Sequence, residues 1–320
     1  MKSVRVFAPA SVANLGVGFD ALGAALDGPG DVVTARLAEK PGVRIVAVGG
    51  DGGRLPRDAR TNTAGVAADA VLEEFAGRGR FGLELSLEKG LPLASGLGSS
   101  AASAAAGAYA AALLLGLRDK RSLLRAVLLA EHAADGGWHG DNAFASLLGG
   151  LVLVPSSDPD GPLSPLALRS PSSLRLVLVH PDLEVVTRAA RRILPKQVPL
   201  ARHVSNAAAF AGLVAALAAG DVRSAGRFVG SDAIVEPVRA KLIRGYPEVR
   251  AAMEAAGAFG VAIAGSGPSL MAVVPAGGAA ARVARAAEAA FSGAGVPAGA
   301  AVHRIDRRGA RALRAGSGGR

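Results

Sequence analysis

The sequence predicts an α+β fold divided into two domains, and three observations lead to this expectation. The chain has 320 residues, which is enough for two domains of ordinary size. Residues 155–171 contain five Pro and four Ser residues, a composition typical of a linker. Beyond it the predicted elements run strand, helices, strand, strand, helix, strand, the order that gives a ferredoxin-like layer. We therefore expect a first domain over residues 1–165, a second over 166–305 and a basic, disordered tail over 306–320.

The elements of the first domain follow from the spacing of apolar side chains. Alternation with period two predicts strands over residues 3–8 and 81–87. The same alternation on either side of Lys40-Pro41-Gly42 predicts a hairpin of two strands, 31–38 and 43–48. Further elements are expected before the linker: helices over 63–75, 101–115, 122–134 and 143–148, and a strand over 150–154.

The second domain is expected to carry helices on both sides of its central pair of strands. Pro195 ends a helix that begins near residue 184, because proline cannot continue the helical hydrogen bonds. The remaining elements are strands over 174–180, 259–264, 269–274 and 300–305, and helices over 200–219, 222–229 and 278–291.

Composition excludes several classes of protein. Cysteine is absent, so the chain has no disulfide framework, no thiolate metal site and no catalytic thiol. No signal peptide and no run of about 18 consecutive apolar residues is found, so we expect a cytoplasmic protein without a membrane partner. The net charge is +10, but residues 303–320 carry half of it and aromatic residues make up only 4%. A nucleic-acid partner is therefore not expected.

A glycine- and serine-rich stretch joins the strand over 81–87 to the helix that follows. Gly96 and Gly98 can adopt positive φ and let the backbone approach a ligand closely. Ser99 and Ser100 lie at the helix start, where free N–H groups and the helix dipole favour an anion. The stretch is neither a Walker loop nor a dinucleotide fingerprint, because the spacing of both motifs is missing. Composition alone fits a phosphate loop and an ordinary helix start equally well.

The residue order in this stretch is more specific than its composition. Pro-x-x-Ser-Gly-Leu-Gly-Ser-Ser-Ala-Ala, over residues 92–102, resembles the phosphate loop of the GHMP kinases. Ala94 departs from the pattern, since the family often has Gly at this position. The resemblance implies the two-domain GHMP kinase architecture, with an N-terminal domain like the second domain of ribosomal protein S5 and a ferredoxin-like C-terminal domain.

A second motif narrows the resemblance to one branch of that family. Residues 9–20 read Pro-Ala-Ser-x-Ala-Asn-Leu-Gly-x-Gly-Phe-Asp and closely resemble the first motif of homoserine kinases. Val17 stands where the branch usually has Pro. Judged without the resemblance, Asn14 and Asp20 would be ordinary turn residues.

A third group of polar residues follows the second apolar helix. Glu131 lies on that helix, where a carboxylate is costly to bury unless it is paired or binds a metal; it could also point to solvent. His139 alone is more often a structural histidine. The spacing Glu-x7-His-x-Asp-Asn, however, resembles homoserine kinases, although Gly140 stands where they usually have Pro or Ala.

Two arginines of the second half complete the resemblance. Thr187 and Arg191 form a Thr-x3-Arg pair, and Arg239 follows Glu-Pro-Val. By themselves these arginines would be solvent-exposed charges, and we keep that interpretation for Arg188 and Arg192. The turn Gly-Ser-Gly-Pro-Ser over residues 265–269 resembles the third GHMP motif, which packs beside the phosphate loop.

The resemblance implies homoserine kinase activity in threonine biosynthesis: ATP and L-homoserine give ADP and O-phospho-L-homoserine. Arg191 and Arg239 are then expected to bind the substrate carboxylate, and Ser99 and Glu131 to bind Mg²⁺. The catalytic group is Asn14, Asp20, His139, Asn142 and Thr187. The ATP site is Asn62, Pro92, Leu93, Ala94, Ser95, Gly96, Leu97, Gly98, Ser99, Ser100, Ala101 and Ala102.

Two other functions remain open at this point. A GHMP kinase of the mevalonate type would keep the phosphate loop but would need no paired arginines. A basic, S5-like RNA-binding protein would use the positive charge and the fold without any kinase activity. We expect the kinase to be a homodimer.

Overall fold

The computed structural model describes residues 3–77 and 79–314 of the chain. The strands are β1 (Ser3–Ala13), β2 (Leu22–Ala38), β3 (Gly42–Gly49), β4 (Gly82–Glu88), β5 (Leu151–Leu153), β6 (Leu166–Leu168), β7 (Arg175–Pro181), β8 (Gly260–Ile263), β9 (Leu270–Val274), β10 (Ala298–His303) and β11 (Arg311–Ala312). The helices are α1 (Thr63–Ala76), α2 (Ser99–Leu114), α3 (Leu124–Asp135), α4 (Asp141–Leu148), α5 (Thr187–Arg192), α6 (Leu200–Ala219), α7 (Val222–Val229), α8 (Glu236–Arg239), α9 (Tyr246–Ala255) and α10 (Ala279–Gly293). Two 3₁₀ turns lie at Lys120–Leu123 and Ala240–Leu242.

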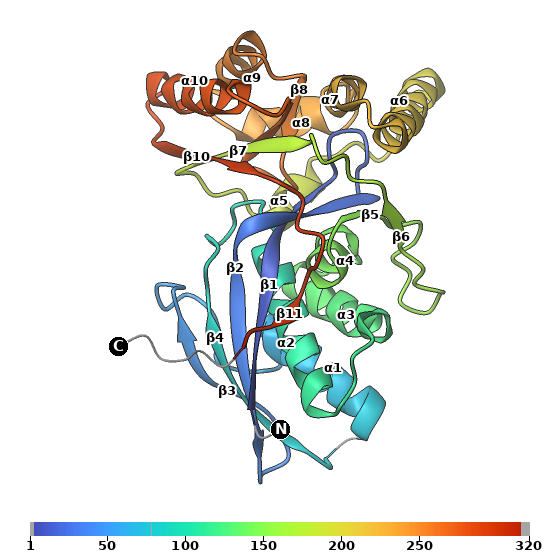
Figure 1. The fold of residues 1–320 in the computed structure, drawn as a ribbon, viewed down its shortest axis with the longest axis vertical. Coiled ribbons are helices and arrows are strands. Elements are labelled where there is room, and N and C mark those ends of the chain that lie inside the picture. Colours follow the sequence, from blue (N-terminus) through green and yellow to red (C-terminus); the bar gives the residue numbers. More distant parts are fainter. Residues whose placement is uncertain (1–2, 78, 315–320) are drawn as a thin grey trace.

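The first domain is a seven-stranded sheet with helices α1 to α4 on one face (Figure 1). Its main path runs β11-β1-β2-β4-β3, and β5 and β6 extend it from β2. Helix α2 lies at the centre of this layer because alanine covers almost all of its surface and lets neighbouring elements approach closely.

Gly107 of α2 marks the closest of these approaches. A Cβ atom on Gly107 would lie 2.4 Å from the carbonyl oxygen of Ala64 in α1. Asn62 starts α1 at this point, since its side-chain oxygen accepts a hydrogen bond from the Ala64 N–H at 3.1 Å. The packing of the two helices therefore depends on a missing side chain.

The second domain has the expected ferredoxin-like sheet, in the order β10-β7-β9-β8 with all pairs antiparallel. Side chains of β7 alternate between two cores. Val177 and Val179 pack against α9 and α10, whereas Leu176 and Leu178 face the opposite core with α6 and α7.

That opposite core also contains residues of the first domain. Val12, Leu22 and Leu97 belong to the same buried cluster as Leu176 and Met271 of the second domain. The two domains thus share one apolar core, which fixes the relative position of the elements on either side of the boundary.

The predicted hairpin of 31–38 and 43–48 is wrong, although both strands exist. β4 lies between them, antiparallel to β2 and parallel to β3. Helix α1 therefore serves as the crossover of a β3-α1-β4 unit.

The expected domain boundaries also differ from the structure. Residues 166–168 form β6, which pairs with β5 in the first sheet, so the second domain begins with β7. The described part of the expected tail is ordered up to residue 314. Arg311–Ala312 pairs with β1, and Ala310 is fully buried and donates to the Leu147 carbonyl oxygen at 3.1 Å. Residues 315–320 lie outside the described residues.

Helix α6 differs from the other helices in its exposure. Leu200 and Val204 are 75% and 57% exposed, and most residues of the first half of the helix are exposed. By length and composition, α6 is the one helix of the described chain that could cross a membrane, which on its own is weak evidence.

Replacing Gly107 with Ala tests the packing of α1 on α2. In an open helix, Gly→Ala stabilises by roughly 0.5–1 kcal/mol, but here the new Cβ meets backbone atoms of Ala64. We expect the free energy of unfolding to fall by about 1–3 kcal/mol, measured by urea denaturation. Gly293→Ala at the end of α10 is the matched control, because no atom lies within 4 Å of its Cβ position. A stabilised Gly107→Ala variant would contradict this packing.

Candidate active site

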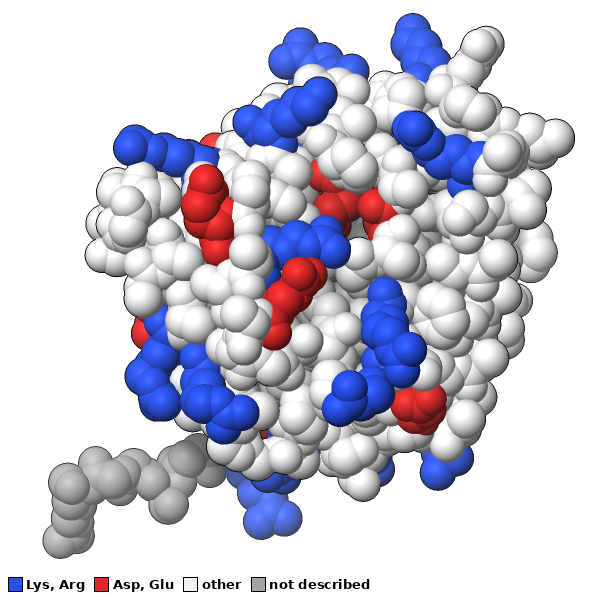
Figure 2. Space-filling view, turned by 90° about the horizontal axis from the view of Figure 1, so that it is seen from above, with Lys and Arg blue, Asp and Glu red and all other residues white. Residues whose placement is uncertain are grey.

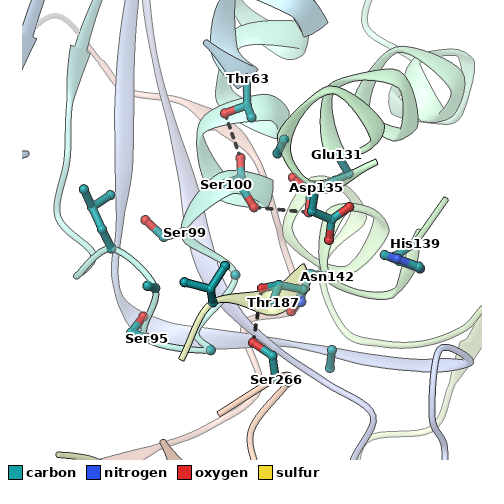
Figure 3. Close-up of a pocket in the computed structure, with 18 of the residues that line it drawn as sticks. Thr63, Ser95, Ser99, Ser100, Glu131, Asp135, His139, Asn142, Thr187 and Ser266 are labelled. Carbon is teal, nitrogen blue, oxygen red and sulfur yellow. Dashed lines mark hydrogen bonds between the residues drawn. The ribbon is translucent and has the colours of Figure 1, made fainter. Parts of the chain in front are cut away.

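A cleft of about 640 Å³ opens between the two domains and collects most of the residues singled out by the motifs. Its walls come from the loop before α1, the start of α2, the end of α3, the start of α4, and from α5 and α8. Figure 3 shows the hydroxyls of the α2 start, the carboxylates of α3 and the Thr187–Ser266 contact facing the same space.

The phosphate loop presents free backbone N–H groups to this cleft. Gly98 occupies the N-cap of α2 in the left-handed region, at φ 65°, and no side chain caps the helix. The first N–H groups of α2 are therefore available to an anion. Ala94 adopts φ 54°, a conformation that favours glycine, which gives a physical reason for the family's preference at this position.

Not all of the predicted ATP-site residues reach the cleft. Leu93, Ala94, Ser95, Gly96, Gly98, Ser99 and Ser100 line it, as does Asn62. Pro92, Leu97, Ala101 and Ala102 do not line it. Leu97 packs in the shared core and both alanines are fully buried, so these residues shape the loop instead of facing a ligand.

A buried ion pair beneath the loop was not predicted from the sequence. Lys89 pairs with Asp31 and also donates to the Ser99 carbonyl oxygen at 2.8 Å and to the Ser103 hydroxyl at 2.9 Å. Burial lowers the pKa of Lys89, and the neighbouring carboxylate of Asp31 opposes this shift. Lys89 thus ties the end of β4 to the first turn of α2. The one sequence signal was a lysine at the end of an apolar strand.

The predicted metal residues include two atoms without a partner. Glu131 is half-buried, with one carboxylate oxygen shielded from solvent, and Ser100 donates to the other at 3.2 Å. Among the described residues, neither the shielded oxygen of Glu131 nor the hydroxyl of Ser99 has a hydrogen-bond partner. Burial raises the pKa of Glu131 to about 8, so the carboxylate would be stabilised by a cation at this position.

The opposite end of the cleft holds an ion pair between the domains. Arg191 donates to both carboxylate oxygens of Asp20, each at 2.8 Å. Burial lowers the pKa of Arg191, but its hydrogen bonds to Asp20 outweigh burial and raise it. Arg191 also lies 3.3 Å from Nδ1 of His139.

The proton of His139 can be placed from this contact. A guanidinium can only donate, so Nδ1 accepts and the proton of the neutral ring lies on Nε2. Burial lowers the pKa of His139, which is consistent with the neutral form. Nε2 has no hydrogen-bond partner within the described chain and is shielded from solvent beside Gly137.

Arg239 is a buried charge of the cleft. The residue is 2% exposed, and its guanidinium donates to the Gly265 carbonyl oxygen at 2.9 Å. No carboxylate in the described part of the chain pairs with it. Burial lowers the pKa of Arg239, and the charge of Arg191 lowers it further. An unpaired buried guanidinium is a site for an anion.

Asn142 and Asn14 hold the polar loops in place. Asn142 accepts from the Ser11 hydroxyl at 2.9 Å, and Asn14 donates to the Gly265 carbonyl oxygen at 2.8 Å. Asp141, beside Asn142, is buried at the cleft wall, and burial raises its pKa to about 7. The sequence analysis did not single out Ser11 or Asp141, although both lie inside the quoted motifs.

The remaining predicted residues use their side chains for hydrogen bonds at the edge of the cleft. Thr187 opens α5, and its hydroxyl lies 3.2 Å from that of Ser266. Asn62 uses its amide group for the α1 cap and for the Pro56 carbonyl oxygen at 2.9 Å. Arg188 and Arg192 are both exposed as expected, and Arg188 in addition lies at the edge of the cleft and donates to the Asp135 carbonyl oxygen at 3.3 Å.

Comparison with known proteins gives the same assignment. The family model of the GHMP kinases N terminal domain matches residues 62–150, and that of the GHMP kinases C terminal matches residues 213–293. A homoserine kinase of Arabidopsis thaliana is 43% identical over 277 residues, covering 85% of this chain and 74% of that protein. One of Xanthomonas campestris is 41% identical over 317 residues, covering 98% and 95%.

A solved structure extends the likeness to the whole fold. The crystal structure of homoserine kinase from Cytophaga hutchinsonii superimposes with a TM-score of 0.92 at 42% identity and covers 98% of both chains. Family models, relatives and fold agree with the cleft described above, and the chain belongs to the homoserine kinases of the GHMP kinase family.

Proposed function

We propose that the cleft transfers the γ-phosphoryl group of ATP to the hydroxyl of L-homoserine, giving O-phospho-L-homoserine and ADP. The observation that carries this proposal is the buried, unpaired guanidinium of Arg239 close to Arg191. Two arginines can bind a carboxylate in a bidentate manner. Mevalonate and shikimate also carry a carboxylate, so the group that distinguishes homoserine is its ammonium, which the carboxylate of Asp20 beside Arg191 suits.

ATP occupies the end of the cleft formed by the phosphate loop. The N–H groups at the start of α2 hold the phosphates, and the dipole of this 16-residue helix favours their charge. Lys89 does not reach the phosphates in this arrangement, since its three contacts fix the loop instead. Asn62 and the loop before α1 then receive the adenine.

The unpartnered oxygens of Ser99 and Glu131 fit Mg²⁺, which prefers a few hard oxygen ligands and keeps several waters. When bound, Mg²⁺ would neutralise charge on the phosphate oxygens during transfer. Burial opposes the ionisation of the Glu131 carboxyl group. Its carboxylate accepts a hydrogen bond from the Ser100 hydroxyl in the same wall of the cleft.

Homoserine occupies the end formed by the second domain. Arg239 and Arg191 bind its carboxylate, and Asp20 offers a negative charge for its ammonium group. His139 lines this end of the cleft beside Arg191, and Asn142 orients the hydroxyl next to the phosphate loop. Because phosphoryl transfer depends mainly on positioning and charge stabilisation, this arrangement needs no strong base beside the hydroxyl.

The two alternative functions are not favoured. A mevalonate-type acceptor carries a carboxylate but no ammonium group, so it gives no reason for the Asp20 carboxylate beside the arginines, and the relatives at 43% and 41% identity are homoserine kinases. RNA binding would use a continuous basic surface. On the face of the second-domain end that Figure 2 shows, basic side chains are dispersed among acidic and uncharged ones, so this face does not offer one.

We also propose that the kinase is a cytoplasmic homodimer without nucleic-acid or membrane partners. The exposed apolar side chains of Leu200 and Val204 on α6 support self-association. Light scattering of the purified protein tests the dimer, and cell fractionation tests the location.

The decisive experiment is a coupled assay of ADP release with homoserine, mevalonate or shikimate as sole acceptor. We expect turnover with homoserine alone. Turnover with mevalonate in preference to homoserine would overturn the proposal.

Replacing Gly98 with Val tests the phosphate loop. A Cβ at this position would lie 2.1 Å from the Ser11 hydroxyl and 3.1 Å from Oδ1 of Asn142, and the residue adopts φ 65°. We expect the variant to bind ATP much more weakly than the parent in calorimetry, because the side chain enters the anion site. Gly116→Val, at φ 83° in open space, controls for backbone strain. Unchanged ATP affinity would remove the loop from the site.

Replacing Glu131 with Gln separates charge from shape. We expect a large loss of turnover across a Mg²⁺ titration, with the fold intact.

The same substitution should change how stability depends on pH. The folded-state pKa of Glu131, about 8, lies above the ordinary 4.5, so the parent protein loses stability as pH rises from 4.5 to 8. Without Mg²⁺, Glu131→Gln should therefore match the parent in Tm at about pH 5 and exceed it at about pH 9. Normal turnover of Glu131→Gln would indicate that Glu131 has only a structural role.

Replacing Arg239 or Arg191 with Lys tests the carboxylate clamp. Lysine keeps the charge but loses the planar fork, so a charge-assisted hydrogen bond worth roughly 1.5–3 kcal/mol is lost. We expect kcat/KM for homoserine to fall about ten- to a hundredfold while the KM for ATP changes little. Arg192→Lys, exposed on the same helix as Arg191, should behave as the parent does. Equal losses at Arg191 and Arg192 would indicate a general basic surface.

A further inference from the structure

One aromatic ring of the first domain lies beneath both substrate arginines of the second domain. The ring centroid of Phe19 is 5.2 Å from Cζ of Arg191 and 5.1 Å from Cζ of Arg239. A guanidinium within about 6 Å of a ring centroid is attracted by the negative face of the ring. Phe19 is therefore in contact with the two charges that the proposed function assigns to one carboxylate.

The two guanidiniums need such a contact because they repel one another. Arg191 is compensated by Asp20, but Arg239 has no carboxylate partner among the described residues, and the charge of Arg191 lowers its pKa. The ring of Phe19 is a contact that both arginines share. The charges of Asp20, Asp141 and Asp232 also favour the charged form of Arg239, but none of these carboxylates forms an ion pair with it in the described chain.

The ring itself is held firmly by an unfavourable backbone. Asn14, Leu15 and Asp20 adopt positive φ values of 72°, 43° and 56°, although none of them is glycine. Such conformations persist only where the surroundings impose them, and they concentrate at functional sites. Here the Asn14 side chain closes the loop, accepting from the Asp20 N–H at 3.0 Å.

The backbone beneath Arg239 is fixed as well. Glu236 begins α8 and accepts from the Ile263 N–H at 3.0 Å, which anchors the short helix to β8. The Gly265 carbonyl oxygen accepts from both Asn14 and Arg239, at 2.8 and 2.9 Å. The Gly265 carbonyl oxygen thus connects the loop that carries Phe19 to the guanidinium of Arg239. The Nε–H groups of Arg191 and Arg239 have no hydrogen-bond partner in the described chain.

We propose that Phe19 is a positioning residue that sets the spacing of Arg191 and Arg239, so that their free N–H groups meet a single carboxylate. Phe19 in this way contributes to the selectivity for an alcohol that carries a carboxylate. The inference rests on the proposed function, because that function assigns the carboxylate to these two arginines.

The test replaces Phe19 with mono-, di- and trifluorophenylalanine by site-specific incorporation. Fluorination weakens the negative face of the ring while keeping its shape nearly constant. We expect the KM for homoserine to rise stepwise, by about fivefold at three fluorines, with kcat and the KM for ATP within about twofold of the parent. Phe19→Leu should raise the homoserine KM by about tenfold or more, and Phe19→Tyr should remain close to the parent.

Phe7 is the matched control, since its ring lies 4.4 Å from Cζ of Arg311 and does not line the cleft. The same fluorinated series at Phe7 should leave every kinetic constant unchanged. A homoserine KM that stays constant across the fluorinated Phe19 series would overturn the inference, even if Phe19→Leu raises it. The ring would then act through its apolar packing and not through its negative face.

A second readout needs no substrate and separates the inference from the proposed function. The side-chain Nε–H resonances of Arg191 and Arg239 should show ring-current shifts in the parent that disappear in Phe19→Leu. If the parent forms no ADP with homoserine, the proposed function fails, and these shifts still decide whether Phe19 holds the two arginines. Arginine resonances that are unaffected by Phe19→Leu would overturn the inference.

Discussion

The active site depends on the close approach of two backbone turns at the domain boundary. A Cβ on Gly96 would lie 2.4 Å from the Ala264 carbonyl oxygen and 2.8 Å from that of Gly267, so only glycine can occupy this position. The contact sets the phosphate loop of one domain against the turn of the other. Ser269 of that turn donates to the Ser95 carbonyl oxygen at 2.6 Å, and its Gly265 carbonyl accepts from Arg239. The nucleotide end and the acceptor end of the cleft are therefore placed by one interface.

Apolar periodicity located the strands of this chain more reliably than their partners. Residues 31–38 and 43–48 are strands, as predicted, but the hairpin rested on the local turn chemistry between them. β4 pairs with both strands, and it lies far from them in the sequence, so no local pattern predicts this pairing. The same limit explains the tail: its Gly, Ala and Arg composition suggested disorder, whereas Ala310 is buried under α4 and Arg311–Ala312 adds to β1.

Motif order identified the residues that face the cleft but not those that hold them. Asp20, Arg191 and Arg239 were named from sequence strings and do converge in space. Lys89 and Asp31 were not, because each is an ordinary charge on a strand until the fold brings them together under α2. Supporting residues of this kind have partners far away in the chain, so a pattern of neighbouring residues does not reveal them.

Burial favours the neutral form of the Glu131 carboxyl group. Each pKa unit corresponds to about 1.4 kcal/mol, so a Glu131 pKa of about 8 means that ionising this carboxyl at pH 7 costs about 1.4 kcal/mol. The folded protein can thus keep Glu131 neutral until a cation arrives, and the ionisation cost is small compared with the attraction of a divalent ion. Binding of the cation should then release a proton from Glu131. Arg239 has no such option, because a guanidinium stays charged. Its charge is favoured by the carboxylates of Asp20, Asp141 and Asp232, by the ring of Phe19 and by the Gly265 carbonyl oxygen, and an incoming carboxylate would add a direct anionic partner.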